Sequence, residues 1–224
     1  MIEQGPIAAE PVPEDCAETT TGRSDARSRI IEATFEALVE HGYAGTSTRE
    51  IAKRAKVSKR ELYAIFGSKQ GILAAMIEGR AARMRLPLAL PQVADRQALA
   101  KTLVSFGTTL VREVSHPAVT ALFRLAVIEA ERSHEVARAL DEGGRKTTRS
   151  ALITFLERAA AQGLIGDGDP EIVAAQFLAL LWGDLQISLV MRLAPPPALA
   201  EIEERARAAA SAVLALYPAR SVSS

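Results

Sequence analysis

The basic residues of this chain gather in one short stretch, from Arg49 to Arg60. Six Lys or Arg residues lie there against a single acid, Glu50. Arginine and lysine donate hydrogen bonds to guanine edges, while hydroxyl and ammonium groups typically contact phosphate oxygens. The stretch therefore predicts an interface with double-stranded DNA, in which Lys59 and Arg60 read the bases. The whole predicted DNA-contacting set is Thr46, Ser47, Thr48, Arg49, Ser58, Lys59, Arg60, Tyr63 and Lys69.

Two short helices are expected to position these side chains. Ser47 and Ser58 each stand three residues before a glutamate, which is the spacing of a helix N-terminal capping box. The pattern predicts helices over residues 48–55 and 59–66, separated by a turn at 56–58 of the length found in helix-turn-helix motifs. Apolar residues at helical spacing would bury one face of the second helix and turn its basic side chains outward.

A wider pattern surrounds these helices, made of Gly42-Tyr43, Thr46-Ser47, Ile51-Ala52, Ala55, Val57-Ser58, Leu62-Tyr63, Phe66 and Ser68-Lys69. With these residues, the stretch 26–77 resembles the DNA-binding domain of the TetR family of bacterial transcriptional regulators. The chain departs from the family at Lys56, where glycine is usual, and at Arg60-Glu61, where a Gly-Thr pair is usual. We therefore expect Lys56 to take a left-handed turn conformation, at a cost of about 1 kcal/mol. We also expect the operator sequence to differ from those of relatives.

Composition favours helix throughout the chain. Alanine and leucine are abundant, aromatic residues make up only 4%, and no segment alternates convincingly as a strand would. The net charge is zero but unevenly spread. Residues 1–22 carry five acids and no Lys or Arg, whereas residues 23–94 carry thirteen basic and seven acidic residues. The positive charge is thus concentrated around the motif, which supports DNA binding.

The sequence also indicates where the protein is located and whether its cysteine has a redox role. The longest apolar stretch, residues 172–193, contains polar and charged residues that argue against a membrane span, and the N-terminus lacks the pattern of a secretory signal. We therefore expect a cytoplasmic protein without membrane contact. Cys16 is the only cysteine and lies in an acidic tail, so we expect neither a disulfide nor a redox role.

Helix breaks and apolar periodicity predict an all-α fold of about nine helices. Four segments are expected: a disordered acidic tail (1–24), a helix-turn-helix DNA-binding domain with its connecting helix (25–85), a helical effector-binding and dimerisation domain (86–217), and a tail (218–224). Gly143-Gly144 is expected to end a short helical segment. The nine helices are expected at 25–41, 48–55, 59–66, 68–85, 95–114, 118–131, 146–162, 170–193 and 198–216.

The second half of the chain offers apolar bulk with a few polar groups, which is typical of a small-molecule site. Residues 118–190, with FRLAVIEAERSHEVARAL and DPEIVAAQFLALLWGD, resemble the C-terminal domain of the AefR-like branch of the TetR family. This resemblance implies dimerisation and an effector pocket, and the expected effector is a small apolar or aromatic molecule. The candidate pocket residues are Phe106, Phe123, His134, Phe177, Trp182 and Gln186. The last two predicted helices are expected to pair across a twofold axis through Phe177, Leu181, Leu185, Ile202, Ala206, Ala209 and Val213.

Catalysis finds no support in the sequence. There is no nucleophile beside a base, no glycine-rich phosphate loop and no metal-ligand spacing, so no cofactor and no metal are expected. The predicted function is a homodimeric, sequence-specific transcriptional regulator, a repressor released from a palindromic operator by a small effector. The alternatives are an activator, a regulator gated by a partner protein, or a helical carrier or enzyme with a vestigial helix-turn-helix.

Overall fold

The computed structural model describes residues 15–89 and 93–219, and within these ranges all regular structure is helical. The predicted all-α class is confirmed, and the predicted number of about nine helices is close. The α-helices are α1 (Asp15–Gly45), α2 (Thr48–Arg54), α3 (Lys59–Phe66), α4 (Lys69–Arg85), α5 (Arg96–Val114), α6 (Pro117–Glu129), α7 (Glu135–Ala139), α8 (Thr147–Ala161), α9 (Pro170–Trp182), α10 (Leu185–Val190) and α11 (Leu199–Leu216). A 3-10 helix, η1 (Leu86–Ala89), follows α4, and a π-helical stretch, η2 (Leu140–Lys146), precedes α8.

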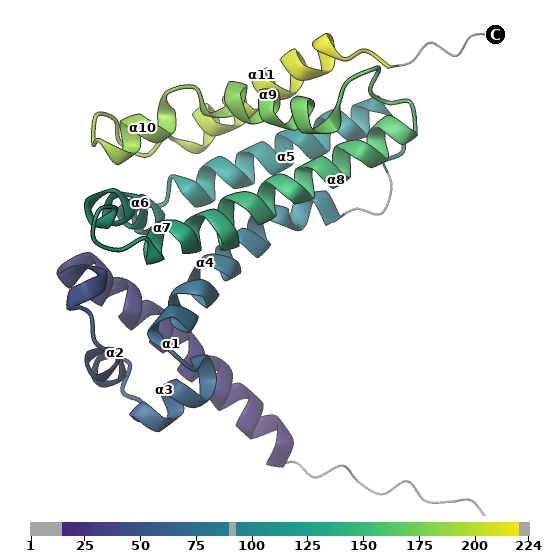
Figure 1. Cartoon of the computed structure of the whole chain (residues 1–224). Helices are drawn as coiled ribbons and strands as arrows, with labels where there is room; N and C mark the ends of the chain where they lie inside the picture. The colour runs from purple at the N-terminus through teal and green to yellow at the C-terminus, as the bar shows by residue number, and fades with distance from the viewer. Residues whose placement is uncertain (1–14, 90–92, 220–224) are drawn as a thin grey trace, which may run out of the picture.

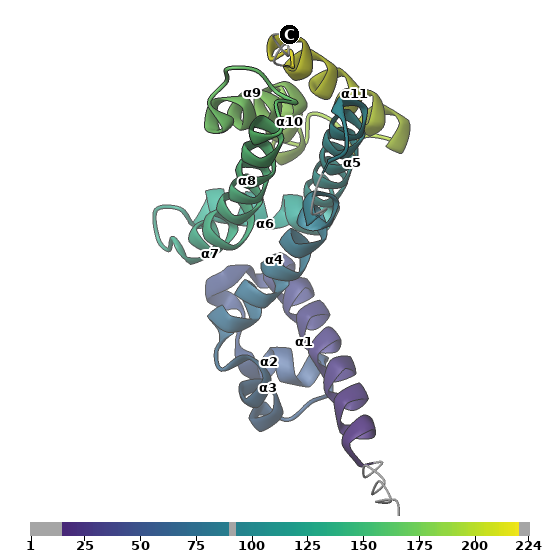
Figure 2. The same ribbon diagram turned by 90° about the vertical axis from the view of Figure 1, so that its right-hand side faces the viewer.

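The helices form two tiers that are joined by α4 (Figure 1). In one tier, α1, α2 and α3 surround the first part of α4, and the other tier contains α5 to α11 (Figure 2). The buried residues Ile30, Ile51, Leu62 and Ile72 come one from each of the first four helices and form a single apolar cluster. A larger core in the other tier packs α5, α8, α9 and α11 together and includes Met84 of α4. Helix α4 is therefore part of both tiers.

A third apolar cluster joins the two tiers. It brings together Leu38 of α1, Ile77 of α4, Leu122 of α6 and Val136 of α7, all of them buried. Protein cores are closely packed and transmit displacement from one element to the next. A movement of α6 or α7 must therefore be felt by α1 and α4.

Serine side chains cap α2 and α3 as predicted. The Ser47 hydroxyl accepts a hydrogen bond from the Glu50 N–H at 3.2 Å, and the Ser58 hydroxyl accepts one from the Glu61 N–H at 3.0 Å. The Glu50 carboxylate accepts from Arg54 Nη2 at 2.6 Å, so the reciprocal half of the first capping box is not formed. The boundaries of α2, α3 and α4 agree with the predicted ones to within one residue.

The turn between α2 and α3 contains the left-handed residue that the sequence predicted. Lys56 has a φ of 54°, although it is not a glycine. The next residue, Val57, donates its N–H to the Ala52 carbonyl oxygen at 3.0 Å, which closes the turn. The turn is therefore held with a side chain in a conformation that costs an L-residue about 1 kcal/mol.

Gly143 and Gly144 do not end a helix, and that prediction was wrong. Both lie in η2, which continues into α8, and the Thr147 hydroxyl donates to the Gly143 carbonyl oxygen at 2.8 Å within this widened turn. A Cβ atom at either glycine would lie 3.4 or 3.5 Å from Cγ2 of Ile77. These are ordinary contact distances, so the two glycines lie where η2 packs on α4 without being required by that packing.

Two other boundaries also differ from the predicted ones. The expected helix 170–193 is divided into α9 and α10, because Gly183 takes a φ of 48° and Arg205 Nη1 donates to the carbonyl oxygens of Leu181 and Trp182. Helix α1 begins at Asp15, so the predicted disorder does not extend over residues 15–24. The rest of that predicted tail, residues 1–14, and the end of the C-terminal tail, residues 220–224, lie outside the described residues.

The residues predicted for a dimer contact lie in the core of a single chain, so this prediction was wrong. Helix α11 packs on α5 and α9, and a Cβ atom at Gly107 of α5 would come within 3.1 Å of Leu181 Cδ1 and 3.2 Å of Ala206 Cβ. The apolar character of α9 on several sides is explained by this packing within its own chain. All seven predicted residues are buried in the larger core of α5, α8, α9 and α11, which we call the upper core: Phe177, Leu181, Leu185, Ile202, Ala206, Ala209 and Val213.

Candidate nucleic-acid interface and effector cavity

Helix α3 lies at the opposite end of the molecule from α11 (Figure 1). Lys59 and Arg60 form its first turn and are exposed, directly after the capping residue Ser58. Among the described residues, no acid pairs with either cation. The first turn of α3 therefore offers two free cations and the N-terminal end of a helix, a combination that attracts phosphate and base acceptors.

Hydroxyl groups gather beside these cations. The Tyr63 side chain is 44% exposed, and its hydroxyl oxygen lies 3.1 Å from Oγ1 of Thr48. Ser47 and Arg49 are exposed on either side of Thr48, at the start of α2. The structure thus places most of the predicted DNA-contacting residues on the starts of two neighbouring helices.

Leu62 anchors α3 to the rest of its tier. Its side chain is fully buried and packs in the same cluster as Ile51 of α2 and Ile72 of α4. Gly67, with a φ of 71°, ends α3, and the Ser68 hydroxyl caps α4 immediately afterwards by accepting from the Gly71 N–H at 3.0 Å. The candidate reading helix is therefore attached to α4 through only two residues.

Two predicted phosphate-binding residues are used inside the protein instead. Thr46 is 2% exposed, and its hydroxyl donates to the Gly42 carbonyl oxygen at 2.7 Å. Lys69 Nζ donates to the carbonyl oxygens of Tyr43 at 2.7 Å and Thr46 at 3.1 Å, and it lies 3.9 Å from the centre of the Tyr43 ring. Burial lowers the pKa of the Lys69 ammonium. The prediction that these two side chains hold phosphates was wrong, because both fasten the end of α1 to its neighbours.

Arg54 is the other cation of the motif that is already engaged. Its Nη2 donates to Glu40 Oε2 and to Glu50 Oε1, each at 2.6 Å. The hydrogen bond from Arg54 is the main reason why the pKa of Glu50 is lowered. Lys53, on the same helix, is exposed. The positive charge available to a duplex is therefore that of Arg49, Lys53, Lys56, Lys59 and Arg60.

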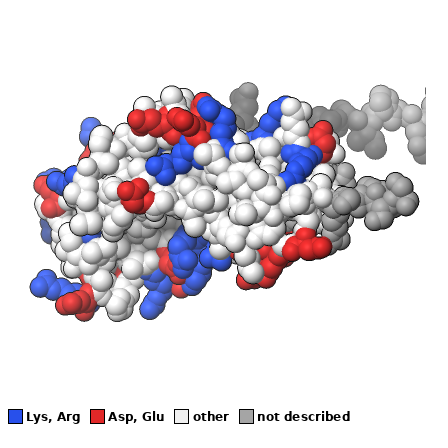
Figure 3. All heavy atoms as spheres, turned by 90° about the horizontal axis from the view of Figure 1, so that it is seen from above, with Lys and Arg blue, Asp and Glu red and all other residues white. Residues whose placement is uncertain are grey.

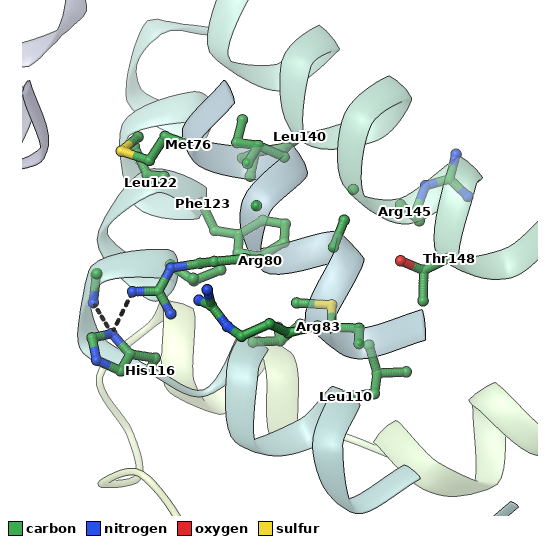
Figure 4. Close-up of a pocket in the computed structure, with 18 of the residues that line it drawn as sticks. Met76, Arg80, Arg83, Leu110, His116, Leu122, Phe123, Leu140, Arg145 and Thr148 are labelled. Atoms are coloured by element: carbon green, nitrogen blue, oxygen red, sulfur yellow. Dashed lines mark hydrogen bonds between the residues drawn. The ribbon is translucent and has the colours of Figure 1, made fainter. Parts of the chain in front are cut away.

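A cavity of about 1060 Å³ lies between the tiers. Its lining includes residues of α1, α4, α5, α6, η2, α8, α9 and α10. The apolar side chains of Met76, Leu110, Leu122, Phe123 and Leu140 surround it in Figure 4. The volume and the apolar lining fit a drug-sized molecule.

The predicted pocket residues divide into two groups. Phe106 and Phe177 are fully buried in the upper core, with their ring centroids 6.1 Å apart, and His134 is exposed at the start of α7. None of these three lines the cavity, so their assignment to it was wrong. The three predicted residues that do line the cavity are Phe123, Trp182 and Gln186.

The polar part of the lining centres on α4. Arg80 Nη1 and Arg83 Nη2 donate to the same oxygen, Glu113 Oε2, at 3.3 and 3.2 Å. Arg80 Nη2 lies 3.5 Å from His116 Nδ1, which also accepts from the Ala118 N–H at 3.2 Å (Figure 4). Burial, and after it the charge of Arg80, lowers the pKa of His116. His116 is therefore a neutral helix cap beside two cations.

Sequence reasoning missed the charged residues of this wall. Arg80, Arg83 and Met84 follow Met76 at intervals of four, seven and eight residues, so all four share one helix face. An arginine within an otherwise apolar stripe could have indicated a polar site. Thr148 gave no such signal, because only the fold shows that it is buried with an unpaired hydroxyl.

Two other kinds of feature are lacking in the described part of the chain. No helix there has both the length and the apolar character that crossing a membrane requires. Nor do three His, Cys, Asp or Glu side chains lie together there as metal ligands would. The main features are thus a basic reading surface at one end and a partly charged cavity behind it.

Comparison with known proteins agrees with this arrangement. Residues 30–76 match the bacterial regulatory proteins of the tetR family, and residues 101–219 match the C-terminal domain of AefR-like transcriptional repressors. The chain is 26% identical over 155 residues to the HTH-type transcriptional regulator YvkB of Bacillus subtilis, covering 69% of this chain and 78% of YvkB.

Solved structures show the same fold. A TetR transcriptional regulator from Agrobacterium tumefaciens superposes with a TM-score of 0.71 at 27% identity, over 88% of this chain and 95% of that one. The flavonoid-responsive regulator FrrA superposes with a TM-score of 0.67 at 30% identity, over 86% of this chain and 96% of FrrA. The chain therefore belongs to the TetR family of bacterial transcriptional regulators, with a C-terminal domain of the AefR-like type, and is a DNA-binding regulator of transcription.

Proposed function

We propose that the protein is a homodimeric repressor that leaves a palindromic operator when a small molecule fills the cavity. The course of α4 supports this most strongly. This helix begins two residues after α3 ends, and Met76, Arg80 and Met84 on its later turns line the cavity. A ligand that binds one position of α4 better than another would shift α3 with it. Residues 25–85 would form the DNA-binding domain, and residues 86–217 the effector-binding and dimerisation domain.

On the operator, the first turn of α3 would enter the major groove. Lys59 and Arg60 are exposed and unpaired among the described residues, so they would donate to guanine O6 and N7. The hydroxyl and cationic groups at the starts of α2 and α3 would contact the phosphates and fix the orientation of the helix. The phosphate-contacting residues would be Ser47, Thr48, Arg49, Ser58 and Tyr63.

The dimer would form through the outward faces of α9, α10 and α11, rather than through the buried residues of these helices. Exposed apolar side chains lie on α9, α10 and α11, and the face seen in Figure 3 has a broad area without acidic or basic side chains. A twofold contact there would bury these residues and set two copies of α3 on one side of a duplex, about 34–36 Å apart. The exposed apolar residues on these helices are Ile172, Leu180, Ile187, Leu199 and Leu216.

The effector would be a small apolar or aromatic molecule. The lining of the cavity supports this class, and the relative FrrA is named as flavonoid-responsive. Release requires only that the ligand prefer the released form of the protein. A 100-fold preference per dimer corresponds to about 2.7 kcal/mol of coupling.

Selection of bound duplexes from a random DNA library tests the proposal. The wild-type protein should enrich a palindrome, and a Lys59→Ala, Arg60→Ala double variant should not. A Lys101→Ala variant is a matched control, because Lys101 is exposed on α5 in the other tier. If the double variant enriched the same palindrome as wild type, α3 would not be the reading helix.

The sign of regulation needs a second measurement. The selected palindrome is placed across a promoter that drives a reporter, with and without the protein. A repressor lowers reporter expression, and an activator raises it. Expression that rises with the wild-type protein and not with the double variant would overturn repression while leaving DNA recognition intact.

A further inference from the structure

We propose that the effector is an organic acid with an apolar body of aromatic size, whose carboxylate is held by Arg80 and Arg83. This inference rests on the proposed function, since it names the ligand of the cavity described above. It goes beyond an apolar or aromatic molecule, because it assigns a charge to the ligand and a place to that charge.

The positive charge of Arg80 and Arg83, which form the α4 wall of the cavity, is only partly neutralised by a neighbouring acid. Arg80 and Arg83 both donate to one carboxylate oxygen of Glu113, so the two cations share one anion and keep one positive charge. The three contacts to this oxygen measure 3.2 to 3.4 Å, which is long for a charge-assisted hydrogen bond. Each guanidinium also has further N–H donors. A ligand carboxylate in the cavity would supply the missing charge and closer acceptors.

Other groups around the cavity do not supply that charge. His116 lies on the far side of Arg80, and its lowered pKa keeps it neutral. Glu32 and Glu36 of α1 line the cavity but are exposed, and neither pairs with an arginine within the described ranges. Arg145 of η2 is a cation already paired, since its Nε donates to Asp141 Oδ1 at 2.6 Å. Arg27 and Arg149 also line the cavity, but among the lining cations that the structure describes only Arg80 and Arg83 share a single carboxylate oxygen, so two neighbouring cations with one anion between them lie on α4.

A second polar position lies across the cavity from the arginines. Thr148 of α8 is 4% exposed, its Oγ1 has no hydrogen-bond partner, and Figure 4 shows this oxygen directed toward the cavity. A buried hydroxyl without a partner is costly, so a ligand group that pairs with it would stabilise the complex. Between the two polar positions the lining is apolar, with Phe123 and Leu140 among its residues. A ligand with an acid at one end and a hydroxyl or carbonyl further along its apolar body matches this order.

The single tryptophan of the chain gives a direct measure of binding, because Trp182 lines the cavity. The probes are a series of phenylalkanoates from phenylacetate to phenylhexanoate, each paired with its primary amide. The amide has nearly the same shape as the acid but no charge. Titration of the dimer without DNA, followed by Trp182 fluorescence, should give a dissociation constant at least about tenfold lower for the best acid than for its amide.

Substitutions in the α4 wall distinguish recognition of the ligand's charge from general damage to the fold. Arg80→Gln and Arg83→Gln should each weaken acid binding about tenfold and leave amide binding nearly unchanged. Arg85→Gln is the matched control, because Arg85 lies on the same helix and bonds to Glu78 and Thr147 without lining the cavity. Glu113→Gln removes the competing anion, so it should tighten acid binding. A variant that merely damaged the fold would weaken it.

The outcome is independent of operator release. Preferred acid binding that leaves DNA affinity unchanged would support this inference and count against a ligand-released repressor. Equal binding of acid and amide, tighter binding of the amide, or no binding by any member of the series would overturn the inference. So would an Arg85→Gln variant that loses acid binding as strongly as Arg80→Gln.

Discussion

The backbone N–H of Tyr43 donates a hydrogen bond to Oε1 of Glu129 at 2.9 Å, across 86 positions of the sequence. The Ala44 N–H lies 3.4 Å from the same oxygen. Tyr43 stands near the end of α1, and Glu129 is the last residue of α6, whose first turns line the cavity. One carboxylate therefore ties the wall of the cavity to the tier that carries α3.

Loss of this carboxylate should destabilise the protein. Glu129→Ala leaves the Tyr43 N–H without its charged partner, and we expect the free energy of unfolding to fall by about 1–3 kcal/mol. Glu129→Gln keeps a carbonyl acceptor and should cost less. Urea denaturation measures both, with Glu131→Ala as an exposed neighbour expected to change stability by less than about 0.5 kcal/mol. An equal loss in the alanine and glutamine variants would show that the hydrogen bond contributes nothing specific.

Substitution of Arg60 should affect base recognition, whereas substitution of Lys53 should affect only the general attraction to phosphates. Arg60→Ala removes a side chain placed to reach base edges, so it should cost about 1–3 kcal/mol on the selected operator and flatten the preference at one base pair in each half-site. Lys53→Ala should weaken all duplexes similarly and lower the slope of log affinity against log salt by about one unit. Competition titrations at several salt concentrations measure both. Unchanged discrimination by Arg60→Ala would assign the reading to another residue.

The left-handed turn residue offers a route to a more stable protein. Because Lys56 has a φ of 54°, a glycine there would relieve backbone strain, and Lys56→Gly should raise the free energy of unfolding by about 0.5–1 kcal/mol. Lys56→Ala also removes the charge but keeps the strain, so it should leave stability nearly unchanged. Thermal or urea unfolding of the three proteins decides this. A glycine variant less stable than the alanine variant would mean that chain entropy outweighs the strain.

His116 should make stability depend on pH below its ordinary pKa. Burial, Arg80 and Arg83 lower the pKa of His116 in the folded protein, while Glu113 opposes them. As pH falls below 6.5, the unfolded chain takes up a proton that the folded chain does not, so this residue causes stability to fall with falling pH. His116→Asn keeps a helix cap without titrating. From about pH 7 to about pH 5, the melting temperature of wild type should therefore fall further than that of the variant, and parallel curves would contradict this.

The reading motif could be predicted from the sequence because its signals are local. The caps at Ser47 and Ser58 and the left-handed Lys56 each depend on neighbours within a few positions, and all three were confirmed. Lys69 and Thr46 were misassigned for the opposite reason. Their partners are carbonyl oxygens around the end of α1, and Tyr43 is 26 positions from Lys69. A lysine that can bond to such groups looks in the sequence like a free phosphate ligand.

The second tier was harder to predict because burial there depends on which helices meet. Apolar residues such as Phe177 and Val213 fit a core, a pocket or a subunit contact equally well at the level of the sequence. Only the packing of α11 on α5 and α9 assigns them to the core. The cavity wall was missed similarly, since Arg80 and Glu113 are 33 positions apart and meet only when α4 lies beside α5.

Because α4 belongs to both tiers, its length determines how far a small tilt at one end displaces the other end. Its 17 residues span about 25 Å at 1.5 Å per residue. A tilt of about 5° at the cavity end would move its other end, and α3 with it, by about 2 Å. In a twofold dimer the two copies of α3 would move in opposite directions, so the distance between them would change by about 4 Å. This is more than the 3.4 Å rise of one base pair. A tilt of a few degrees would thus be enough to move the two reading helices out of register with successive major grooves.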